Sequence, residues 1–210
     1  FCFHNLILIH SNSKENSPTR GNNHSAKSNE ASMAVISYTN LDRIKILVRE
    51  AAEKAIRTVR MNLGDKYAGS GAYIRAYRLP SVSEGYIGLN ELFAAWIGGY
   101  ANDDKLDMYI IVSVEKAIRL ATYAQASGHV SSWESRDTTA KNKYGGAILI
   151  HCLVPELGTE PTNLIFTVSG LSEHGDEAVA ILTALNLPWQ ANGVPEIIEK
   201  INNNLARRLI

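Results

Sequence analysis

A serine–glycine pair at the end of an apolar run is the segment of this chain best suited to bind a ligand. Residues 164–168 predict a buried strand, and Ser169-Gly170 leads directly into a helix predicted to start near Ser172. Free N–H groups at a helix start, with hydroxyls beside them, can hold a carboxylate. Ser172 is equally well explained as a simple N-cap. The candidate ligand-binding residues of this corner are Ser169, Gly170, Ser172 and His174.

Three histidines, His129, His151 and His174, have the chemistry of a general base or an axial haem ligand. No two of them have a metal-binding spacing such as HxH or HExxH, so the sequence predicts no metal site. Each is also explained as a solvated or hydrogen-bonded histidine. With Glu115, which lies on a predicted helix, the candidate catalytic residues are Glu115, His129 and His151.

Aromatic side chains are dense between residues 73 and 109, and arginines alternate among them. The aromatic residues are Tyr73, Tyr77, Tyr86, Phe93, Trp96, Tyr100 and Tyr109, and the arginines are Arg75 and Arg78. Together they could wall a pocket for a flat ligand. Core packing or a subunit interface would use the same residues, and we favour this second interpretation.

Hydrophobic periodicity predicts the elements that position these residues. Helices are predicted over residues 39–60, 113–126 and 172–185 and from Pro195 onward. Short strands are predicted within residues 72–100 and over residues 147–154 and 164–168. Residues 108–112 are read as a strand or as the lead into a helix, and residues 129–144 as a loop with a short helical turn. Together, these helices and strands predict an α+β domain in which helices cover an antiparallel β-sheet made of a meander and a hairpin.

Composition excludes several classes of protein. The 210 residues carry 21 Lys plus Arg and 21 Asp plus Glu, so no basic excess is available for general nucleic-acid binding. No stretch reaches the roughly 18 to 20 apolar residues that a membrane-spanning helix needs. The two cysteines, Cys2 and Cys152, form no disulfide framework and no CxxC pair.

The N-terminal region differs in composition from the rest of the chain. Residues 11–32 contain six Ser and five Asn, too little apolar surface to fold. We therefore expect residues 1–32 to be disordered, or a leader or upstream segment, and residues 33–210 to form a single domain. A chain starting at Met33, the first methionine, would favour a cytoplasmic location, but the compartment itself is not predicted.

Three stretches resemble the GlcG/HbpS-like family, which includes the C-terminal domain of PduO-type proteins. Residues 113–121, SVEKAIRLA, are similar to its central-helix motif, and residues 145–150, GGAILI, to its Gly-Gly-x-Pro-Ile strand. Residues 168–170 followed by 176–180 resemble its Val-Ser-Gly…Asp-Glu-Ala-x-Ala block. The family helix commonly continues Lys-Ala-Arg-Thr-Ala, whereas the matching residues here, 120–124, read LATYA, so the basic pair of the family is absent. Thr122 and Tyr123 of this stretch are further candidate ligand-binding residues.

The resemblance implies an α-β-α, profilin/PAS-like layering, assembly into homo-oligomers and, as in some members, binding of haem or a related tetrapyrrole. We therefore expect an oligomeric protein that binds a small flat anionic molecule, with haem as the named candidate. The alternative is an enzyme on the same scaffold, of isomerase, cyclase or lyase type, that performs acid–base chemistry on a small carbonyl substrate. A third reading is an assembly module whose aromatic residues make subunit contacts.

Overall fold

The computed structural model describes residues 38–80, 88–99, 103–137, 139 and 144–210. All of them belong to one compact unit, Ala34–Ile210. The segment predicted to be disordered or a leader, 1–32, lies outside the described residues. The helices are α1 (Tyr38–Leu63), α2 (Asp103–Ser127), α3 (Glu173–Asn186), α4 (Val194–Ile201) and α5 (Asn204–Leu209). The strands are β1 (Ala72–Leu79), β2 (Asn90–Ile97), β3 (Ala147–Leu153), β4 (Thr162–Ser169) and β5 (Gln190–Asn192).

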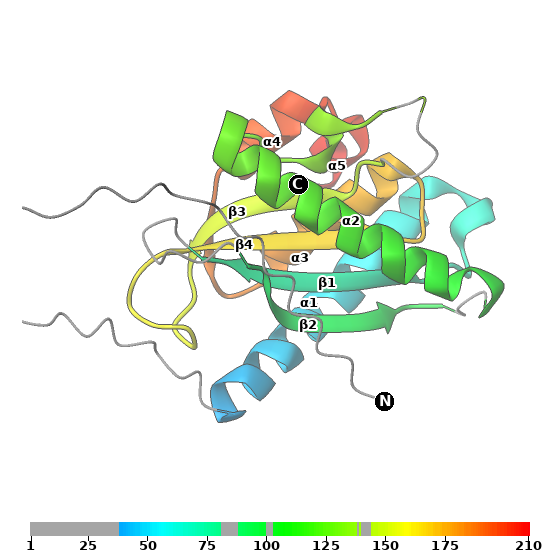
Figure 1. The fold of residues 1–210 in the computed structure, drawn as a ribbon. Coiled ribbons are helices and arrows are strands. Elements are labelled where there is room, and N and C mark those ends of the chain that lie inside the picture. The colour runs from blue at the N-terminus through cyan, green and yellow to red at the C-terminus, as the bar shows by residue number, and fades with distance from the viewer. Residues whose placement is uncertain (1–37, 81–87, 100–102, 138, 140–143) are drawn as a thin grey trace, which may run out of the picture. The chain divides into compact units, whose positions relative to one another are not determined.

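The strands of the described residues form one antiparallel sheet in the order β2-β1-β4-β3-β5 (Figure 1). β1 pairs with its neighbour along the chain, β2, and also with the distant β4, so that Ile74 lies opposite Val168. β3 and β4 form the hairpin that the sequence predicted, with Ala147 opposite Thr167. β4 is therefore a central strand, and its C-terminal end leads into α3.

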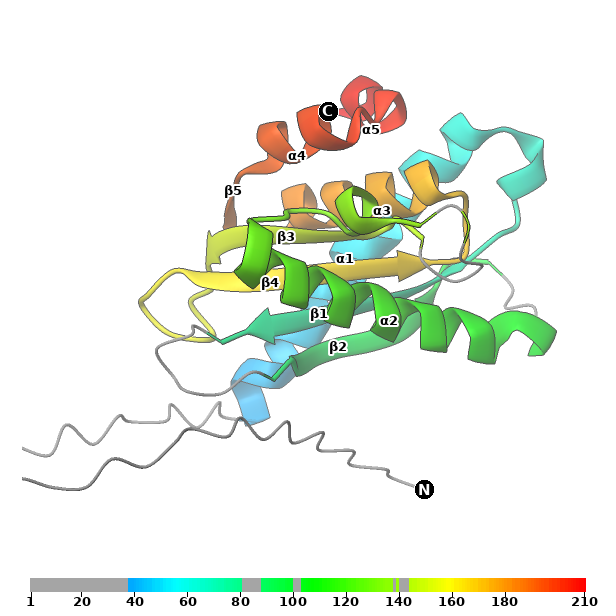
Figure 2. The same ribbon diagram turned by 45° about the horizontal axis from the view of Figure 1, so that its top comes forward.

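Helices cover both faces of the sheet. Alternate residues of a strand point to opposite faces. Ile148 and Phe166 are buried on the face covered by α1 and α3, whereas Ala147 and Ile165 pack with Leu120 of α2 on the other face. Figure 2 shows α2 on one side of the strands and α1 and α3 on the other. The predicted α+β fold with α-β-α layering is thus confirmed.

α1 illustrates how the sequence sets this arrangement. Ile44, Val48, Ala51 and Ala55 are spaced three and four residues apart, and all of them are buried. This spacing places them on one side of the helix. The helix ends before Gly64, whose φ of 84° lies in the left-handed region that glycine adopts readily.

α2 starts earlier than the periodicity alone indicated. Residues 108–112, read as a strand or as the lead into a helix, are part of α2. A short apolar run does not by itself distinguish a strand from a buried helical segment. Residues 129–144 contain the expected short helical turn, a 3-10 helix over Ser132–Ser135.

The C-terminal prediction needs one correction. The single helix expected from Pro195 is two helices, because Asn202 adopts a left-handed backbone with φ of 48° between them. Asn203 then caps α5 by accepting a hydrogen bond from the N–H of Ala206. The short strand β5 was not predicted, since three residues give too little pattern to detect.

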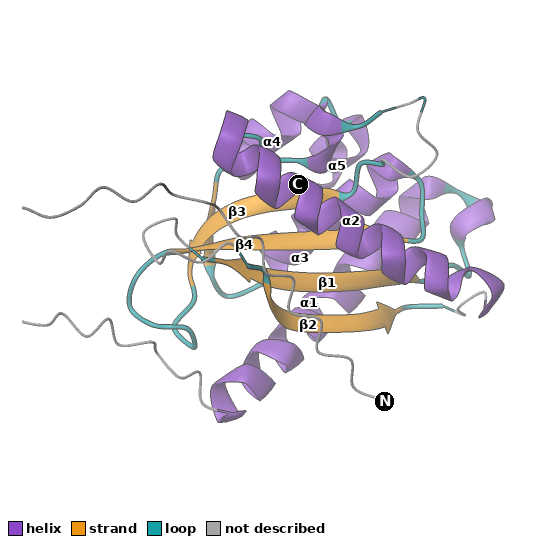
Figure 3. Cartoon of the chain, in the orientation of Figure 1, coloured by secondary structure: helices purple, strands orange, loops and turns teal. Residues whose placement is uncertain are grey.

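Figure 3 shows the helices lying on both sides of the strands. Among the described residues, no helix combines the length and the apolar character needed to cross a membrane.

Candidate functional site

A buried ion pair joins α2 to the start of α3. The ammonium Nζ of Lys116 lies 3.0 Å from Asp176 Oδ2 and donates to the carbonyl oxygen of Val168 at 2.7 Å. Asp176 Oδ1 accepts a hydrogen bond from the N–H of Leu171. Lys116 is 1% exposed and Asp176 is 4% exposed. A single lysine thus ties the middle of α2 to the end of β4 and to the first turn of α3.

The pKa of Asp176 is raised above its ordinary value, and burial is the main cause. The Lys116 ammonium and the Leu171 N–H act in the opposite direction, because both stabilise the carboxylate. The ionised form of Asp176 therefore depends on keeping Lys116 in place.

A second buried carboxylate, Glu177, lies beside this pair. Its Oε1 accepts a hydrogen bond from Ser131 Oγ at 2.6 Å, while its Oε2 has no hydrogen-bond partner among the described residues. Burial raises the pKa of Glu177 to about 7, although the bonds from Ser131 and the Gly146 N–H and the charge of Lys116 lower it. A carboxyl group that titrates near neutral pH has the acidity of a general acid or base.

Two glycines allow the chain to pass close to these charges. A Cβ on Gly146 would lie 2.7 Å from Lys116 Nζ and from Asp176 Cβ, and the φ of Gly146 is +110°. A Cβ on Gly145 would lie 2.7 Å from the ring of Trp133 and 3.3 Å from Glu177 Oε1. Only glycine fits this approach at both positions.

Three planar side chains are stacked at the surface next to the buried charges. The guanidinium carbon of Arg136 lies 3.5 Å from the centre of the Trp133 ring, and the ring centres of Trp133 and His174 are 4.4 Å apart with their planes tilted by 33°. We call Trp133, Arg136 and His174 the stacked corner. Glu173 borders it, with its Oε2 3.8 Å from Arg136 Nη1 and its Oε1 bonded to the Gly145 N–H. The stacked corner therefore combines aromatic faces with one positive and one negative charge.

The expected ligand-binding residues divide into two groups. Ser169, Gly170, Ser172 and His174 are neighbours at the β4–α3 junction, and the Ser172 hydroxyl caps α3 by accepting from the Gly175 N–H. Thr122 and Tyr123 lie toward the C-terminal end of α2. Thr122 donates to a carbonyl of its own helix, and Tyr123 stacks on His129 with ring centres 5.2 Å apart. No contact among the described residues joins the two groups.

The three catalytic candidates have separate surroundings. Glu115 is engaged by Arg119, whose Nε lies 2.6 Å from Glu115 Oε1. His129 packs on Tyr123, and its Nδ1 is buried without a partner among the described residues. His151 is exposed on β3, with its Nδ1 3.0 Å from Asn163 Oδ1. The structure gives no contact between any two of these candidates in the part of the chain that it describes.

The aromatic residues of the first two strands also separate. Tyr73 and Trp96 lie opposite each other on β1 and β2, and Trp96 contacts Tyr109 of α2. Phe93 belongs instead to the core on the face of α1 and α3, where Arg49 lies over its ring. Two of the predicted wall residues, Tyr86 and Tyr100, lie outside the described residues.

Lys116, Asp176 and Glu177 were not among the residues predicted to form a site. Acidic residues at the start of a helix are also explained as complements to the helix dipole. The signal that could have found them is their position inside two of the stretches from which the family resemblance was predicted. The structure places these stretches in contact through Lys116, Val168 and Asp176.

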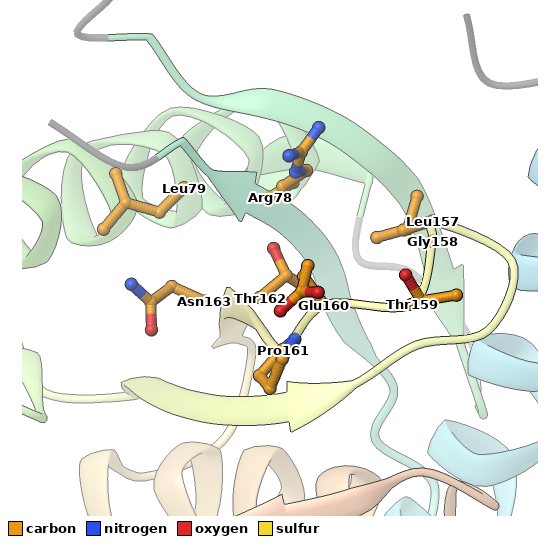
Figure 4. Close-up of a pocket in the computed structure, with 9 residues that line it drawn as sticks. All are labelled: Arg78, Leu79, Leu157, Gly158, Thr159, Glu160, Pro161, Thr162 and Asn163. Carbon is orange, nitrogen blue, oxygen red and sulfur yellow. The ribbon is translucent and has the colours of Figure 1, made fainter. Parts of the chain in front are cut away.

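Two depressions stand out among the described residues, and neither is lined by the stacked corner. One, of about 290 Å³, lies between the end of β1 and the loop from β3 to β4 (Figure 4). The other, of about 270 Å³, is lined by α1 and by residues that follow β3 and precede β5. No histidine lines either of them. A haem bound through an axial histidine needs a slot beside that histidine, and neither of these two depressions offers one. Those residues also contain no group of three or more His, Cys, Asp or Glu that could hold a metal ion.

No protein-family model, curated protein or solved structure matches this chain.

The raised pKa of Glu177 predicts how stability changes with pH. Between the ordinary value of 4.5 and about 7, the folded state holds a proton that the unfolded state has lost. The free energy of unfolding should therefore fall as pH rises through this window, by on the order of 3 kcal/mol in total, and change little above it. Asp176 contributes in the same direction, since its pKa is also raised.

The matched variant is Glu177→Gln, which cannot ionise. Urea unfolding at several pH values should show a smaller fall in stability between pH 4.5 and 7 than in the unchanged chain. Glu199→Gln, a change at an exposed carboxylate of α4, should leave the fall in place. A pH dependence that is the same with and without Glu177 would contradict the assignment.

Proposed function

We propose that this chain is a small-ligand-binding protein whose site is the stacked corner, and that its ligand is a flat molecule carrying a carboxylate. The observation that carries the proposal is the stack of Arg136 on Trp133 on His174 beside the start of α3. The resemblance to the GlcG/HbpS-like family supports it, because the three resembling stretches meet next to this stack.

The chemistry of the stacked corner supports a flat ligand. An aromatic face binds a flat ring by stacking, and a guanidinium pairs with a carboxylate in a planar, two-bond arrangement. Arg136 is exposed, and its ion pair with Glu173 is long at 3.8 Å. A ligand carboxylate can therefore compete with Glu173 for Arg136 at little cost. Of the two ligands named from the sequence, a flat anion fits this surface better than a haem held by an axial histidine.

Two probes separate stacking from iron ligation. Protoporphyrin IX offers the flat ring and carboxylates without iron, and haemin offers the same groups with iron. We expect the full chain to bind both with similar affinity in an absorbance titration. Trp133→Leu and Arg136→Gln should each weaken binding about tenfold, or about 1.4 kcal/mol. Arg57→Gln, at an exposed arginine of α1, is the control that should change nothing. Binding of neither probe, or equal binding by all variants, would refute the proposal.

The oligomeric part of the proposal rests on the outer side of α2. Met108, Ile111 and Ile118 are 49%, 67% and 49% exposed. They share one side of the helix, since Ile111 and Ile118 are two turns apart. An antiparallel pairing of two copies about a two-fold axis would place Ile111 against Ile118 of the partner subunit, which buries both. Assembly of this kind would also account for apolar residues that a monomer leaves in water.

Ile111→Glu tests this assembly. We expect sedimentation velocity to show a dimer or larger species for the unchanged chain and a monomer for the variant, because a buried unpaired charge opposes the contact. Ile46→Glu, which changes a similarly exposed isoleucine on α1, should keep the oligomer. A monomeric unchanged chain would remove this part of the proposal.

Glu177 favours a second candidate function, acid–base catalysis on a small carbonyl substrate. Its pKa of about 7 suits removal of a proton from the carbon next to a carbonyl, and the same group would return a proton to the substrate. We place this function second because Glu177 is completely buried, so a substrate does not reach its carboxyl group in this structure. The test is deuterium incorporation into small 2-oxo acids in heavy water, followed by NMR. Exchange that is accelerated by the chain and lost in Glu177→Gln would support it, and an unchanged exchange rate would exclude it for these substrates.

A further inference from the structure

A buried arginine of α2, Arg119, is bonded to two separate stretches of the chain beside the stacked corner. Its Nη1 donates to the carbonyl oxygen of Ser132 at 2.6 Å and to Ser135 Oγ at 2.9 Å. Its Nη2 donates to the carbonyl oxygen of Tyr144 at 2.5 Å. The side chain of Arg119 is only 7% exposed. One guanidinium therefore ties both stretches to the same helix.

The two carbonyl oxygens belong to the peptides that precede Trp133 and Gly145. Gly145 lies against the Trp133 ring, since a Cβ placed on it would be 2.7 Å from a ring carbon. The Gly145 N–H also donates to Glu173 Oε1 at 2.9 Å, at the border of the stacked corner. Arg119 thus holds the two peptides on which the position of the Trp133 ring depends.

Arg119 is itself held by Glu115, one turn earlier on α2. Arg119 Nε lies 2.6 Å from Glu115 Oε1, and Arg119 Nη2 lies 3.3 Å from Glu115 Oε2. Two bonds between a guanidinium and a carboxylate fix the plane of the guanidinium as well as its position. A lysine would place a single point charge on a flexible stem and would lack the fixed fork of donors. The arrangement therefore requires arginine at this position.

We propose that Arg119 is a positioning residue of the ligand site, which holds the Trp133 ring in its binding arrangement before a ligand arrives. This inference rests on the proposed function and adds how that site is kept preformed. A preformed site avoids the free-energy cost of ordering side chains and loops on binding. The 3-10 helix Ser132–Ser135 has its own cap at Ser131. Removal of Arg119 therefore releases this turn from α2 and leaves the turn itself formed.

Amide hydrogen exchange of the full chain, followed by NMR, tests the positioning without a ligand. The N–H of Arg136 donates to the carbonyl oxygen of Trp133 at 3.2 Å, so its exchange reports the opening of this turn. In Arg119→Ala we expect this exchange to be about tenfold faster. Arg60→Ala is the matched control, because Arg60 Nη1 also donates to a backbone carbonyl oxygen, that of Ser70, from a different helix. The control should leave the exchange of Arg136 unchanged, and an unchanged rate in Arg119→Ala would overturn the proposal.

Chemical rescue separates positioning from a loss of charge. Methylguanidinium supplies the missing planar donors to Arg119→Ala and should slow the exchange of Arg136 again in a saturable way. Methylammonium has the same charge without the fork of donors and should not. If Arg119→Ala does not fold, Arg119→Lys keeps the charge and the buried stem, and its exchange should still be faster than in the unchanged chain. Equal rescue by the two cations, or an unchanged rate in Arg119→Lys, would overturn the proposal.

Titration with protoporphyrin IX connects the positioning to the ligand site. The affinity should fall about tenfold in Arg119→Ala and recover with methylguanidinium, while Arg60→Ala should bind as the unchanged chain does. Unchanged affinity in Arg119→Ala, in spite of faster exchange, would overturn the positioning role and leave the proposed function in place. No porphyrin binding by the unchanged chain would overturn both, and the exchange rates would then still show whether Arg119 holds the turn.

Discussion

Replacing Lys116 by methionine is expected to lower the free energy of unfolding by about 3–5 kcal/mol, the range found when one partner of a buried ion pair is removed. The change leaves the carboxylate of Asp176 buried without its cation and the carbonyl oxygen of Val168 without its donor. Methionine is close to lysine in shape, so the loss reports the charge and the hydrogen bonds rather than a cavity. Urea unfolding of the full chain measures the effect.

A double-mutant cycle separates the ion pair from general damage to α2. Asp176→Asn removes the charge that Lys116→Met leaves unpaired, so the double variant should be more stable than the sum of the two single losses predicts. Lys105→Met changes an exposed lysine on the same helix and should alter stability by less than about 0.5 kcal/mol. Additive losses in the cycle would show that Lys116 and Asp176 do not form the pair described here.

Gly146→Ala is expected to cost about 3 kcal/mol or more, because two effects of the added methyl group combine. The φ of +110° is unfavourable for alanine, and the new Cβ would meet Lys116 Nζ, Asp176 Cβ and the Val168 carbonyl oxygen at 2.9 Å or less. The methyl group can be accommodated only by moving the buried ion pair. Urea unfolding again measures the effect.

Gly158→Ala is the matched control for Gly146→Ala. Gly158 also has a positive φ, of 138°, but nothing lies within 4 Å of the position of its Cβ. The control therefore carries the backbone strain without the collision, and it should cost about 1 kcal/mol. Equal losses at the two positions would show that the close approach to Lys116 is absent.

The fold was predictable from the sequence because its elements have strong patterns. The apolar spacing of α1 and the glycine and proline residues that bound the strands are local features that a sequence displays directly. The early start of α2 and the break at Asn202 were harder to predict from the sequence. In the first case a short apolar run fits a helix and a strand alike, and in the second the left-handed backbone of one asparagine decides the outcome.

The candidate site was predictable only in part. Ser169 and Ser172 could be named because a strand that leads into a helix is visible in the sequence. The pairing of Lys116 with Asp176 joins residues 60 positions apart, and periodicity gives no information on such a contact. The acidic residues of α3 fit a surface role at the helix start, so their burial against α2 became apparent only from the fold. The contact between the rings of Trp133 and His174 depends on the path of a loop, which no sequence pattern encodes.

The most direct test of the proposed site is a crystal structure of the full chain with protoporphyrin IX. The account predicts that the flat ring lies on the stacked corner, against the exposed ring of His174, with a carboxylate of the porphyrin paired to Arg136 and the Lys116–Asp176 pair buried beside it. A porphyrin bound elsewhere on the chain, or a stacked corner with no ligand against it at saturating porphyrin, would contradict the account.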